Sequence, residues 1–175
     1  MYTCAITGDQ PTAFKFKYNE KDSRCKRLKR RLQEQFALLY DQGVRRFLVG
    51  GALGVDQWSG EILLKMNLEP DYKDIELIVV LPYPGHDERW NQRSRARLGF
   101  LMQHSTDRII IGTKAWRESF IQRDRYLIDH ANYLLAVHNN KQHFHNGAGE
   151  MIRYAQSRHL MTILIHPETF EISHV

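Results

Sequence analysis

The sequence predicts a doubly wound α/β fold, with a mostly parallel sheet of about six strands and helices on both faces. Two observations carry this prediction. Short β-type runs alternate with helical patterns along the whole chain, and most of these runs are continuously apolar, as in strands that are buried on both faces of a parallel sheet. No linker, repeat or low-complexity segment interrupts the alternation, so residues 1–175 are expected to form one domain.

The expected elements follow one another through short connections. In chain order, the expected strands are residues 2–7, 45–50, 75–81, 107–112, 132–137 and 161–165. Apolar side chains recur at helical spacing in five segments between them, namely Leu28, Leu32, Phe36 and Leu39; Val55, Trp58, Ile62 and Met66; Leu98, Leu101 and Met102; Phe120, Leu127 and Ile128; and Met151, Ile152 and Ala155. Because ligands of open parallel sheets bind at the carboxyl ends of the strands, the loops that follow the strands are the expected binding region.

Composition predicts a cytoplasmic protein that does not enter a membrane. Hydrophobic residues make up 42% of the chain and charged residues 26%, which is ordinary for a globular protein. The longest apolar run, IELIVVLPY, is shorter than the roughly 18 residues that a membrane span requires. The first residues, MYTCAITG, lack the basic segment and the cleavage site of a signal peptide. The two cysteines, Cys4 and Cys25, form neither a disulfide framework nor a metal-binding spacing.

Positive charge is concentrated in one predicted helix. The net charge is +5, and much of the excess comes from Arg24, Lys26, Arg27, Lys29, Arg30 and Arg31. Two interpretations are open: the solvated face of a helix, or a surface that contacts phosphate or nucleic acid. Charge alone does not separate them.

The stretch GGALGVD, residues 50–56, lies between a predicted strand and a predicted amphipathic helix. Unpaired N–H groups at a helix N-terminus attract phosphate, and glycine lets a ligand approach the backbone. We therefore expect Gly50, Gly51, Ala52 and Gly54 to hold a phosphate-bearing ligand. The turn is expected at the surface, so that a valine at Gly54 would block the ligand and leave the fold intact. Asp56 would cap N–H groups or face a ligand hydroxyl; the alternative is a tight turn that holds nothing.

Several motifs, taken together, resemble a known family. They are CAITGDQP, GGALGVDQWSGEILLKM, VVLPYPGHDERWNQRSRARL, QRDRYLIDHANYLLAVHN and NGAGEMIRYAQ, and they extend over most of the chain. In this order they resemble the YpsA-like proteins of the SLOG superfamily, which also includes the DNA-processing protein A family and the LOG-type nucleotide-processing enzymes. The resemblance implies a Rossmann-like domain that senses or processes a nucleotide-derived ligand. It does not define a reaction.

The chain departs from the family pattern at three positions. Asp124 stands where the family usually has Asn, Asp9 replaces an aromatic or basic residue, and Ala148 replaces the threonine of the G-G-T loop. Backbone N–H groups of that loop can still bind an anion, and Asp124 is expected to pair with a neighbouring arginine. The loop and the end of the first strand complete the expected ligand site with Gly8, Asn146, Gly147, Ala148 and Gly149.

The resemblance also suggests a pair of catalytic residues. In LOG-type enzymes an arginine and a glutamate cleave the N-glycosidic bond of a nucleoside monophosphate, and Arg123 and Glu150 are their nearest counterparts by position. A carboxylate can stabilise positive charge at the ribose carbon while a guanidinium holds the phosphate. In the structural alternative, Glu150 offsets the dipole of its helix and Arg123 pairs with Asp124 or Asp129. The second acidic residue of the enzyme motif is missing, which favours this alternative.

One aromatic residue is a candidate for stacking on a base, and three histidines are candidates for binding a metal ion. Trp90 follows PYPG among charged residues, where it would either stack a base or pack against the core. His138, His143 and His145 raise the question of a metal site, but no cysteine lies near them, so no metal ion and no cofactor are expected.

The sequence thus predicts the binding or sensing of a nucleotide-derived, phosphate-bearing ligand at the C-terminal edge of the sheet. One alternative is a nucleoside-monophosphate N-glycosidase that uses Arg123 and Glu150. The other is single-stranded nucleic-acid binding through the basic helix. The sequence leaves open whether the protein is an enzyme and whether it forms a homo-oligomer.

Overall fold

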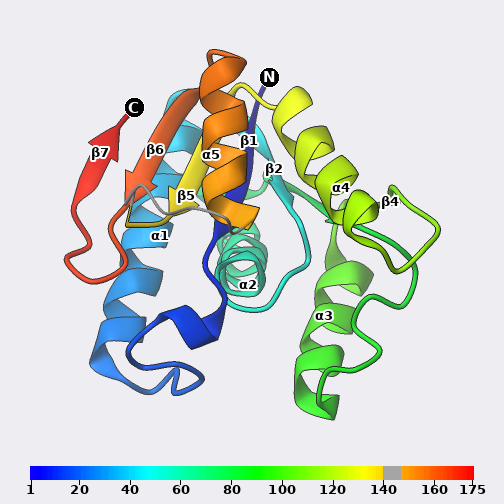
Figure 1. Ribbon diagram of the computed structural model, residues 1–175. Helices are drawn as coiled ribbons and strands as arrows, with labels where there is room; N and C mark the ends of the chain where they lie inside the picture. Colours follow the sequence, from blue (N-terminus) through cyan, green and yellow to red (C-terminus); the bar gives the residue numbers. More distant parts are fainter. Residues whose placement is uncertain (140–146) are drawn as a thin grey trace.

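Seven strands form one sheet in the computed structural model, which describes residues 1–139 and 147–175 (Figure 1). The strands are β1 (Tyr2–Gly8), β2 (Val44–Val49), β3 (Glu76–Leu81), β4 (Asp107–Ile110), β5 (Tyr133–Val137), β6 (Met161–Ile165) and β7 (Ile172–His174). Their order is β4-β3-β2-β1-β5-β6-β7, and all neighbours are parallel except β6 and β7. The expected Rossmann-like, mostly parallel fold is confirmed. The sheet has one strand more than expected, because the three residues of β7 are too few to produce a periodic pattern.

Five α-helices and two short 3-10 helices connect the strands. The helices are α1 (Ser23–Asp41), α2 (Val55–Asn67), α3 (Gln92–His104), α4 (Arg117–Asp129) and α5 (Gly147–Ser157), with η1 (Pro11–Ala13) and η2 (Pro70–Tyr72). Each expected helical segment lies in one of the five. None of the helices in the described ranges combines the length and the apolar character that a bilayer crossing requires.

In β1, β2, β3, β5 and β6, alternate residues enter two separate cores, as the continuously apolar runs predict. In β2, Phe47 and Val49 pack with α1, α2 and α3, whereas Leu48 packs with α4 and α5. Figure 1 shows α4 and α5 in front of the sheet and α1 behind it. Helices therefore cover both faces, and the carboxyl ends of the strands are where a ligand is expected.

The strand order reverses between β1 and β5, at the centre of the sheet. The two strands are in register to their carboxyl ends, where Gly8 lies opposite Val137. The chain then continues from β1 to α1 on one face and from β5 to α5 on the other. Such a reversal opens a crevice between the two departing loops, which is where ligands of this class of fold bind.

Candidate functional site

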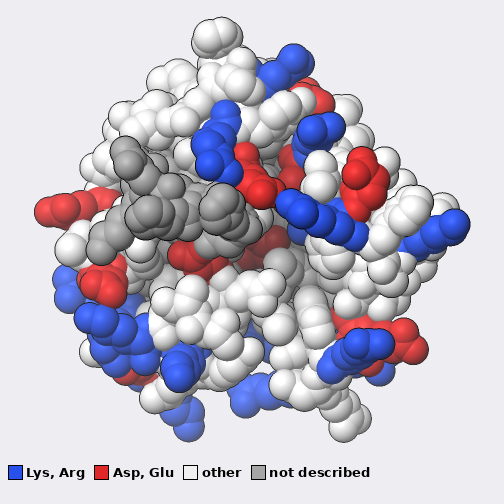
Figure 2. All heavy atoms as spheres, in the orientation of Figure 1, with Lys and Arg blue, Asp and Glu red and all other residues white. Residues whose placement is uncertain are grey.

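Two adjoining cavities lie at this crevice. The outer cavity has a volume of about 810 Å³, and Leu53, His86, Trp90, Arg117, Phe120, Ile121 and Glu150 contribute to its walls. The inner cavity, of about 300 Å³, is lined by Thr7, Gly8, Asp9, Thr12, Asp56 and Ala148 among others. The wall that both cavities share consists of Gln10, Ala52, Arg123, Asp124 and Gly147. Figure 2 shows acidic side chains within the hollow at the centre of this face and basic ones beside it.

The structure brings most of the expected site residues to these cavities. Those that line a cavity are Gly8, Ala52, Asp56, Trp90, Arg123, Gly147, Ala148 and Glu150. Among the residues of the described ranges, Gly50, Gly51, Gly54 and Gly149 line neither cavity, and Asn146 lies outside the described residues.

The glycines of the turn after β2 are required by the packing of the chain itself. Gly51 and Gly54 have φ angles of +72° and +85°, which residues with a Cβ rarely adopt. A Cβ on Gly51 would lie 2.5 Å from Cδ2 of Leu81, and one on Gly54 would lie 2.9 Å from the carbonyl oxygen of Asp9. Both glycines are buried. The expectation that a valine at Gly54 would leave the fold intact is therefore wrong, since this side chain would strain the backbone as well as obstruct a ligand.

Asp56, in the first turn of α2, is buried and binds the same turn from the inside. Its Oδ2 accepts a hydrogen bond at 3.2 Å from the amide of Ala52, which belongs to the turn before α2 and not to the helix that Asp56 was expected to cap. Burial raises the pKa of the Asp56 carboxyl to about 6, although the charge of Arg123 acts in the opposite direction. The Ala52 amide, which was expected to bind phosphate, thus donates its hydrogen bond to a carboxylate of the protein.

Arg123 of α4 connects this helix to the turn after β2 from the wall that the cavities share. The residue is 8% exposed. Its Nη1 donates to the carbonyl oxygen of Gly50, and its Nε donates to Oδ1 of Asp124 at 2.7 Å. The expected pairing of Arg123 with Asp124 is confirmed, whereas Asp129 pairs with Arg158. Because a guanidinium has five N–H groups, Arg123 retains donors for a ligand at the shared wall.

Two carboxylates, Asp124 and Glu150, lie on one side of the outer cavity. Glu150 is in the first turn of α5, where a negative charge offsets the helix dipole, and it is 3.8 Å from Nη2 of Arg117. Burial and, to a smaller extent, the charge of Glu150 raise the pKa of Asp124, while Arg123 lowers it. The outer cavity therefore has two acidic side chains close enough to influence each other.

Aromatic side chains also line the outer cavity. Trp90 is half-buried, and its ring meets the His86 ring edge-on with 5.2 Å between the centroids. Trp90 also packs against the hydrophobic core, so both roles expected for it are compatible with its position. The sequence analysis did not single out His86 or Phe120, which also line this cavity. The only signal for His86 was its place in a loop after a strand.

His86 also holds the turn after β2. Its Nε2 lies 3.1 Å from the carbonyl oxygen of Gly51, and since a carbonyl only accepts, Nε2 carries the proton. Burial lowers the pKa of His86, which favours the neutral ring. Its Nδ1 is buried and has no hydrogen-bond partner within residues 1–139 and 147–175.

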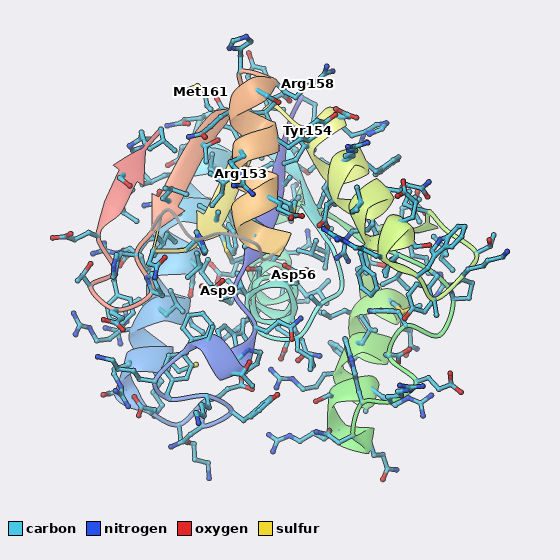
Figure 3. The ribbon with its side chains drawn as sticks, viewed as in Figure 1. Asp9, Asp56, Arg153, Tyr154, Arg158 and Met161 are labelled. Atoms are coloured by element: carbon cyan, nitrogen blue, oxygen red, sulfur yellow. The ribbon has the colours of Figure 1, made fainter. Side chains whose placement is uncertain are left out.

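A histidine and an aspartate join the ends of β1 and β5. Nδ1 of His138 is 3.3 Å from Oδ1 of Asp9, which lines the inner cavity. Figure 3 shows Asp9 and Asp56 near the first turn of α5, whereas Arg158 lies near the other end of this helix. His143 and His145, the other two histidines considered for a metal, lie outside the described residues.

The basic segment of α1 lies outside both cavities. The Arg27 guanidinium stacks 4.9 Å from the centroid of the Phe170 ring, and Nε of Arg31 donates to the Phe170 carbonyl at 3.1 Å. Lys26, Lys29 and Arg30 line a separate groove of about 320 Å³ together with Lys65 of α2. Part of the segment is therefore packed against the protein, and the rest faces a groove of its own.

Comparisons with known proteins identify the family. Residues 4–170 match the model of the YpsA family, described as the YspA SLOG family. Among similar proteins are UPF0398 proteins of Staphylococcus epidermidis, Staphylococcus saprophyticus and Staphylococcus aureus, which are 28%, 25% and 24% identical over 117 residues. These residues are 66% of this chain and 61% to 62% of the relatives, so the chain spans about three fifths of the length of the curated relatives it matches. Because the family model covers nearly the whole chain, the protein belongs to the YspA SLOG family.

Proposed function

We propose that the protein binds or senses a nucleotide-derived, phosphate-bearing ligand in the outer and inner cavities. The observation that carries this proposal is the buried guanidinium of Arg123 in the shared wall, with the aromatic ring of Trp90 in the same outer cavity. A guanidinium binds phosphate oxygens through charge-assisted hydrogen bonds, and an aromatic ring stacks on a base. The position at the reversal of strand order supports the same conclusion.

Replacing Trp90 with alanine is expected to weaken the binding of AMP about tenfold or more, since loss of one base-stacking ring costs roughly 1–3 kcal/mol. The affinity for ribose 5-phosphate, which has no base, should remain close to that of the parent. Both are measured by calorimetric titration, after circular dichroism has shown that the variant is folded. The matched control is Trp116→Ala, because Trp116 is 54% exposed and lines neither cavity.

The proposal fails if neither the monophosphates AMP, GMP, CMP and UMP nor the diphosphates ADP, GDP and UDP change the melting temperature at millimolar concentration or give a heat of binding. An equal loss of affinity for AMP and for ribose 5-phosphate in Trp90→Ala would place the base elsewhere.

A nucleoside-monophosphate N-glycosidase is the second candidate, and the proximity of Asp124 to Glu150 favours it. A carboxylic acid with a raised pKa can protonate a leaving base, and a second carboxylate can stabilise the positive charge on the ribose. We nevertheless expect no release of adenine from AMP, because Asp124 is engaged by Arg123 at 2.7 Å. Chromatography that detects free adenine, after AMP has been incubated with the parent or with Glu150→Gln, decides between binding and N-glycosidase activity. If the parent releases adenine and Glu150→Gln does not, the protein is an N-glycosidase and the proposal of binding without catalysis is overturned.

Substituting Arg27, Arg30 and Arg31 together with glutamine is expected to change the affinity for AMP less than twofold, on the order of 0.4 kcal/mol, which is usual for surface positions. None of the three lines the outer or the inner cavity. Calorimetry with AMP is paired with fluorescence anisotropy of a labelled single-stranded oligonucleotide at two salt concentrations. A loss of affinity for the oligonucleotide alone would favour nucleic-acid binding through α1. In that case the affinity of the parent for the oligonucleotide should fall steeply with salt. A large loss for AMP would mean that the nucleotide binds at α1.

A further inference from the structure

The two cavities meet at one wall but differ in chemistry. Gln10, Ala52, Arg123, Asp124 and Gly147 line both, so a ligand can extend from one cavity into the other past the Arg123 guanidinium. With about 810 Å³ and about 300 Å³, each cavity reaches the size of a small-molecule site. A mononucleotide has one base and one sugar, and it would leave much of this space unfilled.

The inner cavity is unsuited to phosphate. Among the described residues, three carboxylates line it, those of Asp9, Asp56 and Asp124, against the single guanidinium of Arg123. A phosphate in this cavity would face three carboxyl groups and one guanidinium, and like charges repel each other. Carboxylates instead accept hydrogen bonds from hydroxyl groups, and Thr7 and Thr12 add hydroxyls that both donate and accept. This lining suits an uncharged group that is rich in hydroxyls.

The outer cavity has the complementary properties. In the part that the structure describes, its charges balance, with Arg117 and Arg123 against Asp124 and Glu150. The rings of Trp90 and Phe120 provide aromatic surface, whereas the described lining of the inner cavity has no aromatic ring and its apolar part comes from aliphatic side chains such as Ile6, Leu127 and Met151. An aromatic base fits here, and a phosphate finds both arginines on this side of the shared wall.

We propose, on the basis of the function proposed above, that the ligand is a nucleoside diphosphate that carries a sugar. The nucleoside occupies the outer cavity, the diphosphate lies beside Arg123 at the shared wall, and the sugar enters the inner cavity among Asp9, Asp56 and Thr12. The two cavities and their common guanidinium carry this inference, because they match a ligand with one aromatic end, one hydroxyl-rich end and negative charge between them.

Matched pairs of probes test the inference. Calorimetric titrations compare ADP with ADP-glucose, GDP with GDP-mannose and UDP with UDP-glucose. In at least one pair, the attached sugar is expected to tighten binding tenfold or more. Thr12→Val replaces one hydroxyl by a methyl group of similar size. It is expected to lower the affinity for the sugar derivative at least threefold and to leave the affinity for the diphosphate alone unchanged. Thr113→Val is the control, since Thr113 is exposed and lines neither cavity.

The possible failures of the two proposals are distinct. If the nucleoside diphosphates bind but the sugar tightens none of the pairs, the two-part ligand is overturned and nucleotide binding stands. If Thr12→Val weakens both members of a pair equally, the sugar does not occupy the inner cavity and the inference is overturned. If neither the diphosphates nor their sugar derivatives bind, both proposals fall.

Discussion

Replacing Arg123 with glutamine is expected to lower the free energy of unfolding by about 3 kcal/mol, the range observed when one partner of a buried ion pair is removed. The change deletes the donor to the Gly50 carbonyl and leaves the Asp124 carboxylate without its cation. It also removes the positive charge that favours ionised Asp56. AMP binding should weaken at least tenfold in the folded variant, since a hydrogen bond to a charged group contributes roughly 1.5–3 kcal/mol. Urea unfolding and calorimetric titration measure the two effects separately.

The double variant Arg123→Gln with Asp124→Asn shows whether the buried charge is the cause. It should regain part of the lost stability, because no carboxylate is left unpaired at position 124. Arg158→Gln is the matched control, since Arg158 is exposed and pairs with Asp129 near the far end of α5 (Figure 3). If Arg123→Gln is as stable as this control, the guanidinium does not hold the turn after β2.

Asp56 is expected to make the protein less stable as the pH rises from about 4 to 7. Burial raises the pKa of this carboxyl from 3.8 to about 6, so the folded state binds a proton more tightly than the unfolded state. Stability relative to Asp56→Asn should therefore be highest below pH 4, fall through the interval between the two pKa values, and level off above pH 6. The total change is roughly 3 kcal/mol, because each pKa unit corresponds to about 1.4 kcal/mol.

Asparagine suits this comparison because its side-chain oxygen can still accept the hydrogen bond from the Ala52 amide. Urea unfolding of the parent and of Asp56→Asn at several pH values gives the difference in free energy, in which the other titrating groups cancel. Asp71→Asn, at an exposed position of η2, controls for the loss of one negative charge. A difference between parent and Asp56→Asn that stays constant from pH 4 to 7 would show that burial does not perturb this carboxyl.

Six of the strands and the five α-helices were predictable from the sequence, because the strands leave short apolar runs and the helices leave apolar side chains at helical spacing. The run that became β2 is apolar at Phe47, Leu48 and Val49, which only a strand covered on both faces requires. The location of the site followed from the fold class, since every predicted loop of interest ends a parallel strand. The three-residue strand β7 left no such pattern and could not be anticipated.

The contacts that shape the site were not predictable in the same way. Arg123 and Gly50 are 73 positions apart, and their hydrogen bond depends on how α4 packs beside the end of β2. The reach of Asp56 back to Ala52 is local, but whether a first-turn aspartate faces a ligand or its own turn depends on burial. The one signal for His86, its place in a loop after a strand, did not indicate a role, because a single histidine in a loop is compatible with many roles.

The turn after β2 is held at three successive residues by three different side chains. Arg123 binds the Gly50 carbonyl, His86 the Gly51 carbonyl, and Asp56 the Ala52 amide. The turn is therefore preorganised: its backbone entropy is lost when the protein folds and not when the ligand arrives, which favours tighter association. Substitutions that loosen any one of these anchors should then reduce affinity even for a ligand that never touches the residue replaced.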